Sequence, residues 1–566
     1  MRTNHVVGIA IAVRVTQALL TQTFFQPDEY FQSLEVAHRA VFGYGQLTWE
    51  WSIERPIRSI VFPSLWIPVY WILYKTNLHN TGALIWAPKI ISGLIASLSD
   101  IAVCRLSAQL LGPSSVPITL LTSLTSFFHA LSLVRSMSNS LETSLTVLAV
   151  SYWPLQPHQR ITFKTLFRSV AIAALTCAIR PTNIVIWTYL SLELLLRRVR
   201  KTTSSFVTFL SCVVPLGGLI PLLQVFADSA YFDKWTFTPL NFLKVNLSPI
   251  SLFYGGNPWH YYLTQAIPIL LTSCLPLFLH GVYLILLGRL TPRGSHPAFR
   301  TLLGLLAWTI AIYSMAGHKE WRFIHPVLPI MHIFCTVSLM SRKTAGTSNL
   351  AKLLTEPKGF IILLSLPVIV YTTFIHGRAQ IAVMHHLRSL PPQNLQSVGF
   401  LMPCHSTPWM AYLHRPQLDG GKAWSLGCEP PLRVPSSSQY LDQTTAFYFS
   451  PVDYLRDYFP QSVDPSFPTS PRPKSDPSSS SPLPMKANTR YAKRGFYFVD
   501  SWKHTWPQHL VMFGVLPKVE NPDTGETVGY FLRKKGYERS WRTFNGFEED
   551  DKRRGGVEVW SWQGVS

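Results

Sequence analysis

The sequence predicts a polytopic α-helical membrane protein with about eleven transmembrane helices and a small α+β domain at its C-terminal end. Of the 566 residues, 47% are hydrophobic and only 14% are charged, whereas soluble domains have about 25% charged residues. The apolar residues form long runs such as 83–98, 204–226 and 263–288, which reach or approach the roughly 20 residues that cross a bilayer. Basic residues collect in the short connections between such runs, which is the pattern that orients membrane proteins.

Two other readings of these features are disfavoured. The net charge of +21 would suggest a nucleic-acid-binding protein only if the basic residues gathered on one face, and here they are divided among the connections. Residues 1–25 combine a basic start with an apolar run but have no clear A-x-A-like cleavage site after that run. We therefore expect them to form a retained first helix and not a removed signal peptide.

Twelve apolar segments are candidates for crossing the membrane: 6–24, 57–75, 83–111, 115–134, 140–156, 164–180, 183–198, 204–226, 263–289, 300–316, 325–341 and 357–376. The basic connections 157–164, 197–203, 289–300 and 342–352 are expected to be cytosolic. Counting crossings backwards from 197–203 places residues 76–82 on the lumenal side. Counting forwards from a cytosolic N-terminus places the loop after the first helix on the same side. The two counts agree only if 57–75 does not cross the membrane. Its Pro63 and Pro68 fit a re-entrant or interfacial helix, although membrane helices also tolerate proline.

This topology divides the chain into a membrane domain, residues 1–376, and a lumenal C-terminal domain, residues 377–566. The membrane domain then has large lumenal loops at 25–58 and 227–262. The polar runs RSMSNSLET (135–143), RPTN (180–183) and GHKEWRF (317–323) also become lumenal. A structural protein has no reason to gather these charges on one side of a bundle, so the shared sidedness predicts a membrane enzyme.

The C-terminal domain has the composition of a soluble protein. Strand-like runs at 495–499, 509–516 and 528–532 predict a small α+β fold, and the Pro/Ser-rich insertion 461–484 is expected to be disordered. Cys404 and Cys428 would form a disulfide if this domain faces an oxidising lumen. No CxxC or HExxH pattern is present, so no metal site is predicted.

Asp28 and Glu29 follow directly on the first apolar segment. Transfer of a sugar to a hydroxyl needs a general base, and a carboxylate commonly serves at such centres. We expect the shorter Asp28 to be the base and Glu29 to orient it or the acceptor. The alternative is that the pair only caps a helix.

Cations that could bind a phosphate lie in the later lumenal connections. His318, Lys319 and Arg322 surround Glu320 in one short run, and Arg180 precedes a helix; such groups bind phosphate by charge-assisted hydrogen bonds. The alternative for this run is that its basic side chains only snorkel to the membrane interface. Arg180 and Arg135 could each support the site, or each could only cap the C-terminus of a helix. The aromatic residues of 227–262 suit either sugar stacking or an interfacial belt. No nucleotide-binding motif is present, which favours a donor carried in the membrane.

Several of these runs are similar to the GPI mannosyltransferases of glycosyltransferase family 22. The resemblance lies in FQPDEYFQSLEVAHRAVFGYGQLTWEW (25–51), RPIRS (55–59), HKEWRFIHPVLP (318–329) and FLMPCHSTP (400–408), and it covers most of the chain apart from the Pro/Ser insertion. The family's acidic motif matches Asp28 and Glu29. Its HKE-x-RF motif matches 318–323, with Trp321 at the variable position. Arg58, Arg135 and Glu320 are expected to support the site.

The resemblance implies a GT-C fold in the endoplasmic reticulum membrane with a lumenal site. The enzyme would transfer mannose from dolichyl-phosphate-mannose to a two-mannose GPI glycolipid as the third, α1,2-linked residue, by an inverting single displacement. It implies no cofactor, and protein partners are not predicted.

Two alternatives remain from the residues alone. Sister mannosyltransferases, which add the fourth GPI mannose or the α1,2- or α1,6-mannoses of the N-glycan precursor, share the acidic and HKE-like motifs. The lipid intermediate that accumulates without the enzyme separates them. A lipid or solute transporter would place its charges at mid-bilayer within repeated, interrupted helices, and no internal repeat is found here.

Overall fold

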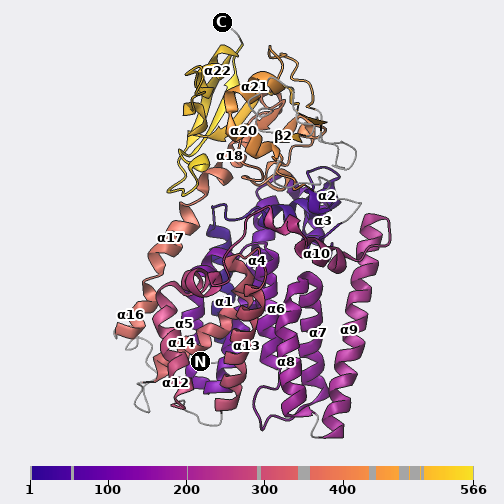
Figure 1. The fold of residues 1–566 in the computed structure, drawn as a ribbon, viewed down its shortest axis with the longest axis vertical. Coiled ribbons are helices and arrows are strands. Elements are labelled where there is room, and N and C mark those ends of the chain that lie inside the picture. Colours follow the sequence, from indigo (N-terminus) through magenta and orange to yellow (C-terminus); the bar gives the residue numbers. More distant parts are fainter. Residues whose placement is uncertain are drawn as a thin grey trace.

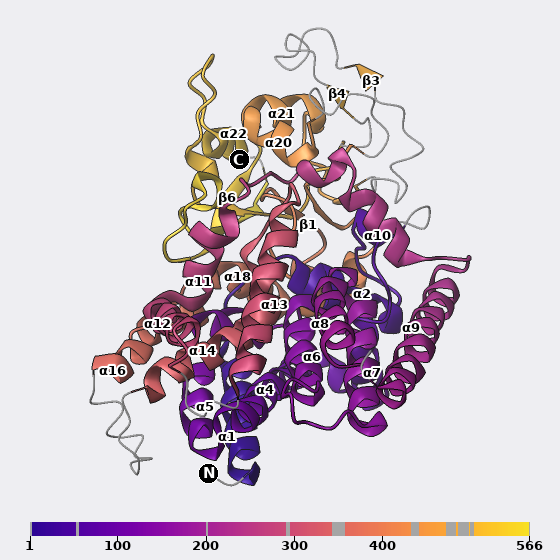
Figure 2. The same ribbon diagram turned by 60° about the horizontal axis from the view of Figure 1, so that its bottom comes forward.

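A helical bundle carries the α+β domain on one end (Figure 1). The structure is a computed structural model that describes residues 3–51, 56–199, 202–289, 295–341, 357–431, 441–470, 483–484, 497–498 and 503–564. The bundle contains α1 (Thr3–Leu20), α2 (Glu35–Phe42), α3 (Ile67–Lys75), α4 (Ala83–Leu111), α5 (Val116–Leu124), α6 (Ser138–Tyr152), α7 (Phe163–Ile179), α8 (Ile184–Arg197), α9 (Thr203–Phe232), α10 (Thr238–Asn246), α11 (Ile267–Leu271), α12 (Leu275–Leu286), α13 (His296–Ser314), α14 (Leu328–Met340), α16 (Pro357–Leu363) and α17 (Leu366–Phe374). Helix α1 packs on α4, α4 on α6, α6 on α7 and α7 on α9, in a row that both views show (Figures 1 and 2).

Each of the eleven segments predicted to cross the membrane contains helix. Within the described residues, six helical stretches are long and apolar enough to cross: Thr3–Leu20, Ala83–Leu111, Thr203–Phe232, Tyr262–Leu286, Trp321–Met340 and Gly359–Ser389. The exposed face of α9 is apolar, with Val214 65% and Phe226 56% exposed, as expected for a helix that faces lipid. The total of eleven crossings stays a prediction.

Segment 57–75 has the form expected of a non-crossing element. It consists of a short 3₁₀ turn, Pro63–Leu65, and the nine-residue helix α3. Nine helical residues span about 14 Å, which is less than half of the roughly 30 Å hydrocarbon core.

The two ends of the bundle hold different connections. At the end away from the C-terminal domain, Gln156 donates to the Oγ of Ser295 at 3.0 Å, and Ser295 donates to the carbonyl of Leu110 at 2.6 Å. Arg198 joins the same end through the Pro154 carbonyl at 2.8 Å. These contacts bring together connections predicted to be cytosolic, while parts of 197–203, 289–300 and 342–352 lie outside the described residues.

A buried ion pair inside the bundle was not anticipated, although both charges interrupt apolar segments. Arg14 of α1 donates two hydrogen bonds to Asp100 of α4, at 2.7 and 2.9 Å, and both side chains are fully buried. Ser123 donates to the same carboxylate at 2.7 Å, and Gln17 accepts a third bond from the guanidinium at 2.9 Å. The guanidinium also donates to the backbone carbonyl of Ser123 at 2.8 Å, so four of its N–H groups are hydrogen-bonded within the bundle.

Removing one partner of this pair is expected to destabilise the bundle. Asp100→Leu leaves the Arg14 guanidinium buried without a counter-charge, at a cost of about 3–5 kcal/mol. We expect a clear loss of thermal stability of the detergent-solubilised protein, measured by size-exclusion after heating. The double variant Arg14→Met with Asp100→Leu is the control, because it removes both charges and should recover most of the loss. Equal stability of Asp100→Leu and the unmodified chain would contradict this.

The C-terminal domain is built on a five-stranded mixed sheet with strand order β2-β1-β5-β7-β6. Strand β1 runs parallel to β2 and β5, and β7 runs antiparallel to β5 and β6. The strands are β1 (Val398–Phe400), β2 (Ala423–Ser425), β5 (His509–Phe513), β6 (Tyr537–Thr543) and β7 (Val557–Trp562), with a separate pair β3 (Leu483–Pro484) and β4 (Tyr497–Phe498). The helices are α18 (Arg378–Ser389), α19 (Met410–Leu413), α20 (Gln443–Phe449), α21 (Pro451–Tyr458) and α22 (Val528–Lys534).

Two expectations for this domain need correction. Residues 528–532 form helix α22 and not a strand, because the Thr527 side chain caps the amide of Tyr530, and Phe531 and Leu532 turn together into the core while Tyr530 stays 51% exposed. The predicted insertion begins too early at 461: Phe467 is buried, and the amide of Ser470 donates to a carbonyl of the domain. Residues 471–482 lie outside the described residues.

The first loop and the C-terminal domain share one hydrophobic core. Residues of the first loop such as Tyr30 and Phe31 pack in the same cluster as Met384 of α18 and Phe400 of β1. Gly377 marks the junction: it has φ +81°, and a Cβ there would lie 2.2 Å from the carbonyl oxygen of Phe24. The C-terminal domain is therefore packed against the start of the first loop.

Candidate active site

Asp28 lies where the first helix gives way to the first loop. The chain leaves α1 at Leu20 and re-enters helix as a π-helical turn, Tyr30–Leu34. Arg322, which is 294 residues away in sequence, donates from Nη1 to Oδ2 of Asp28 at 2.5 Å. The Asp28 side chain keeps 21% of its surface exposed. The carboxylate is thus held by one strong contact and remains accessible.

Arg322 is fixed from its other side by Glu320. Its Nε donates to Oε2 at 2.7 Å and its Nη2 to Oε1 at 2.9 Å, the two-point geometry that suits a guanidinium. Burial alone would raise the pKa of Glu320, but Arg322 and His318 hold that pKa well below its usual range. The amide of Asn139 donates to the backbone carbonyl of Arg322 at 3.1 Å. The guanidinium therefore bridges two carboxylates in a defined orientation.

Glu29 takes a different partner from its neighbour. It is paired with Arg135 at 3.0 Å, and the same guanidinium also donates to the hydroxyl of Thr23 at 2.8 Å. The hydroxyls of Ser33 and Ser136 donate to the backbone carbonyl of Glu29 at 2.6 and 2.7 Å. Burial raises the pKa of Glu29, with Arg135 opposing the rise. These contacts make Glu29 an anchor of the loop, and they separate it from Asp28.

His318 and Lys319 face the second loop and not the carboxylate of Asp28. His318 bonds the carbonyl of Gly255 at 2.8 Å and the Glu320 carboxylate at 3.2 Å, and the second of these bonds raises its pKa. Lys319 and Asn257 exchange reciprocal bonds to backbone carbonyls, at 2.7 and 2.8 Å. The run predicted to bind phosphate instead joins the 227–262 loop to the start of α14.

Arg58 and Arg180 come together at a cavity beside this cluster. The cavity is small, about 20 Å³, and is lined by both arginines, Pro181 and Phe242, among others. Arg180 is paired with Glu142 at 2.9 Å. Its guanidinium also lies 5.6 Å from the centre of the Phe323 ring, the ring that Arg322 approaches at 5.9 Å.

The carboxylate partner of Arg58 comes from its own loop. Arg58 is bound by Glu50 through Nε and Nη2 at 3.0 and 2.6 Å. Asp28 and Arg322 also lie close enough to influence the Arg58 guanidinium: the charge of Asp28 raises its pKa and the charge of Arg322 lowers it. Three arginines and Asp28 thus form one contiguous group at the end of the bundle beside the C-terminal domain.

Sequence reasoning had not singled out the acids that hold Arg58 and Arg180. Glu50 lies in the quoted TWEW run and Glu142 in RSMSNSLET, so each was visible inside a polar motif. Nothing in the spacing showed that Glu50 would pair with Arg58 or that Glu142 would pair with Arg180. Such pairs depend on tertiary packing.

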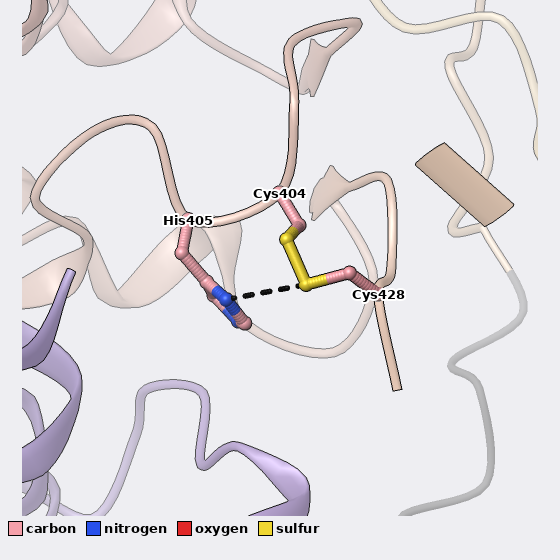
Figure 3. A group of neighbouring side chains, drawn as sticks. All are labelled: Cys404, His405 and Cys428. Carbon is pink, nitrogen blue, oxygen red and sulfur yellow. Dashed lines mark hydrogen bonds between the residues drawn. A yellow bond between two sulfur atoms is a disulfide. The ribbon is translucent and has the colours of Figure 1, made fainter. Parts of the chain in front are cut away.

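A disulfide joins Cys404 to Cys428 in the C-terminal domain, and His405 lies against it (Figure 3). The three side chains offer ligand atoms within 4.8 Å of one another, which resembles a metal-binding group. The two sulfurs, however, are bonded to each other and are not thiolates, and the thiolate is the form that ligates metal. The group is therefore a cross-link with a histidine beside it.

Comparison with known proteins yields a consistent set of relatives. A model of the Alg9-like mannosyltransferase family matches residues 6–414. The chain is 36% identical to GPI alpha-1,2-mannosyltransferase 3 of Mus musculus over 461 residues, 81% of this chain and 79% of that protein. It is 34% identical to GPI mannosyltransferase 3 of Yarrowia lipolytica over 554 residues, 97% of this chain and 95% of that protein. Among solved structures it aligns with ArnT from Cupriavidus metallidurans bound to undecaprenyl phosphate, with a TM-score of 0.49 and 12% identity over 75% of this chain and 85% of that chain.

Proposed function

Because this chain belongs to the Alg9-like mannosyltransferase family, we propose that it transfers mannose from dolichyl-phosphate-mannose to a GPI glycolipid precursor that already carries two mannoses. The new mannose is the third and is α1,2-linked. The relatives named GPI alpha-1,2-mannosyltransferase 3, which match most of the chain, support this choice. The observation that carries the chemistry is the contact of Asp28 with Arg322, which joins the acidic motif to the HKE-x-RF motif.

Asp28 acts as the general base. Its carboxylate takes the proton from the acceptor 2-hydroxyl while the hydroxyl oxygen forms a bond to the anomeric carbon of the donor. The bond between that carbon and the phosphate oxygen breaks, and its electron pair stays on the dolichyl phosphate. One displacement converts a β-linked donor into an α-linked product. Arg322 holds the carboxylate in a fixed orientation, because the guanidinium is itself held by two hydrogen bonds to Glu320.

Arg58 and Arg180 bind the departing phosphate. They line a common cavity next to Asp28 and Arg322, and guanidinium groups stabilise the charge that develops on a leaving phosphate. This shifts the phosphate site from the expected His318 and Lys319, whose side chains are directed to the second loop. Two fixed cations supply the charge at this position, so no metal or other cofactor is required.

In this proposal the site faces the lumen of the endoplasmic reticulum, in a protein with the GT-C architecture. The basic connections that pack together at the opposite end of the bundle support this orientation. A disulfide in the domain beside the site also favours an oxidising compartment.

Purified protein tests the function directly. We expect it to transfer radiolabelled mannose from dolichyl-phosphate-mannose to a synthetic two-mannose GPI lipid, and to leave a three-mannose GPI lipid and a dolichol-linked oligosaccharide unmodified. Cells lacking the protein should accumulate the two-mannose intermediate. Transfer only to the three-mannose lipid or to the dolichol oligosaccharide would replace the proposal by one of the sister activities, and no transfer at all would reject both.

A further inference from the structure

His405 has an uncommon backbone conformation. Its φ is +54°, a left-handed value that is unfavourable for residues other than glycine and that clusters at functional sites. The neighbouring Cys404 is bonded to Cys428, which holds the turn in place. A strained turn that a covalent bond maintains is a reason to ask what its side chain contacts.

The imidazole of His405 lies on the first loop of the membrane domain. Its ring centre is 4.4 Å from that of Phe31, which follows Asp28 by three residues. Among the described residues, Asp28 is the one whose charge raises the pKa of His405. The ring also lines a small cavity of about 10 Å³, together with Phe31, Ser406, Thr407 and Ser425. Aromatic carbon and hydroxyl groups therefore lie together beside the ring, and both are groups that contact sugars.

The protonation state of His405 follows from its surroundings. Burial lowers the pKa of His405 to about 4, and Asp28 opposes the decrease, so the ring is neutral at pH 7. Its Nδ1 lies 3.6 Å from Sγ of Cys428. A disulfide sulfur has no proton to give, so a hydrogen bond there is donated by Nδ1, and the neutral ring then carries a lone pair on Nε2. That nitrogen can accept a hydrogen bond from a hydroxyl group.

The turn is also tied to both lumenal loops. Tyr254 of the second loop donates to the carbonyl of Cys428 at 3.2 Å, and Trp49 of the first loop donates to the Tyr254 hydroxyl at 3.0 Å. The disulfide loop is therefore hydrogen-bonded to the second loop, which is in turn hydrogen-bonded to the first loop, the one that carries Asp28. The sequence had not shown what the C-terminal domain contributes, and these hydrogen bonds connect it to both loops.

We propose that His405 positions the acceptor, with Nε2 accepting a hydrogen bond from a hydroxyl of the acceptor glycan beside Asp28, and that the Cys404–Cys428 disulfide holds it there. This rests on the proposed mannosyltransferase function and goes beyond it, because it assigns recognition of the acceptor to the C-terminal domain. His405 is a positioning residue and takes no proton in the reaction.

Steady-state kinetics of the purified full-length protein, with the two substrates varied separately, tests this. Loss of one hydrogen bond to the acceptor in His405→Ala should raise KM for the two-mannose GPI lipid about tenfold, with KM for dolichyl-phosphate-mannose and kcat within twofold. His405→Gln places an acceptor atom near the position of Nε2 and should recover most of the affinity, whereas His405→Asn is too short and should not. His386→Ala is the matched control, since His386 also stacks on an aromatic ring, that of Trp541 at 4.7 Å, and should leave both KM values unchanged.

The outcomes separate the inference from the function on which it rests. If the unmodified protein does not use the two-mannose GPI lipid, the proposed function fails. If it does, and His405→Ala leaves the acceptor KM unchanged or raises both KM values equally, the inference is overturned. Equal kinetics for His405→Gln and His405→Asn would also overturn it, and this comparison stands even if the alanine variant does not fold.

Discussion

Replacing Asp28 by asparagine is expected to lower kcat for mannose transfer by about 10²–10⁴-fold, the range for loss of a general base. The amide has nearly the same shape and its oxygen still accepts from Arg322, so the local structure should persist. KM for both substrates should change little, because the carboxylate accepts the proton during the chemical step and does not contribute to substrate binding. Radiolabelled mannose transfer at saturating substrate, with product lipids separated by chromatography, measures the effect.

Asp233→Asn is the matched control for this substitution. Asp233 is exposed, follows the end of α9 on the second loop, and has φ +52°, a conformation that asparagine also accepts. It should retain full activity. An Asp28→Asn protein with unchanged kcat would remove Asp28 from the role of base.

Replacing Arg322 by lysine is expected to lower kcat by about 10²-fold, the effect of a small misplacement of a reacting group. The positive charge remains, but an ammonium group cannot span Asp28 and Glu320 with three directed bonds as the guanidinium does. The Asp28 carboxylate would then no longer be held in one orientation. The same transfer assay, combined with thermal unfolding to show that the protein is folded, measures this.

Arg197→Lys controls for the chemical change. Arg197 is 59% exposed and is paired with Glu193 at 3.4 Å on α8, near the opposite end of the bundle, where exposed ion pairs contribute at most about 1 kcal/mol. Its activity and stability should match those of the unmodified chain. A fully active Arg322→Lys protein would show that charge alone suffices and that orientation of Asp28 by Arg322 is unnecessary.

The helical part of the fold could be predicted because apolar runs of membrane length leave few alternatives. The helix at 83–111 begins and ends at the expected residues, since Gly112 with φ +87° follows it. The strand expected at 528–532 shows the limit of this reasoning. A five-residue apolar run fits a strand or a buried helical turn equally well, and the Thr527 cap decided the outcome.

At the site, the sequence predicted which motifs would meet but not how their charges would pair. The acidic and HKE-x-RF motifs do converge, through Asp28 and Arg322. The sequence predicted that Glu29 would orient Asp28 or the acceptor, but it could not show the ion pair of Glu29 with Arg135, because Arg135 comes from a distant connection. Lys319 looked like a phosphate ligand by charge alone, yet its ammonium group is bound by a backbone carbonyl of the second loop.

An electron cryo-microscopy structure with dolichyl phosphate and the two-mannose GPI lipid bound would test most directly whether base and leaving group act from opposite faces of the sugar. We predict the phosphate on Arg58 and Arg180, and the acceptor 2-hydroxyl within hydrogen-bonding distance of Asp28 on the other side. A phosphate on His318 and Lys319, or an acceptor hydroxyl out of reach of Asp28, would contradict the account.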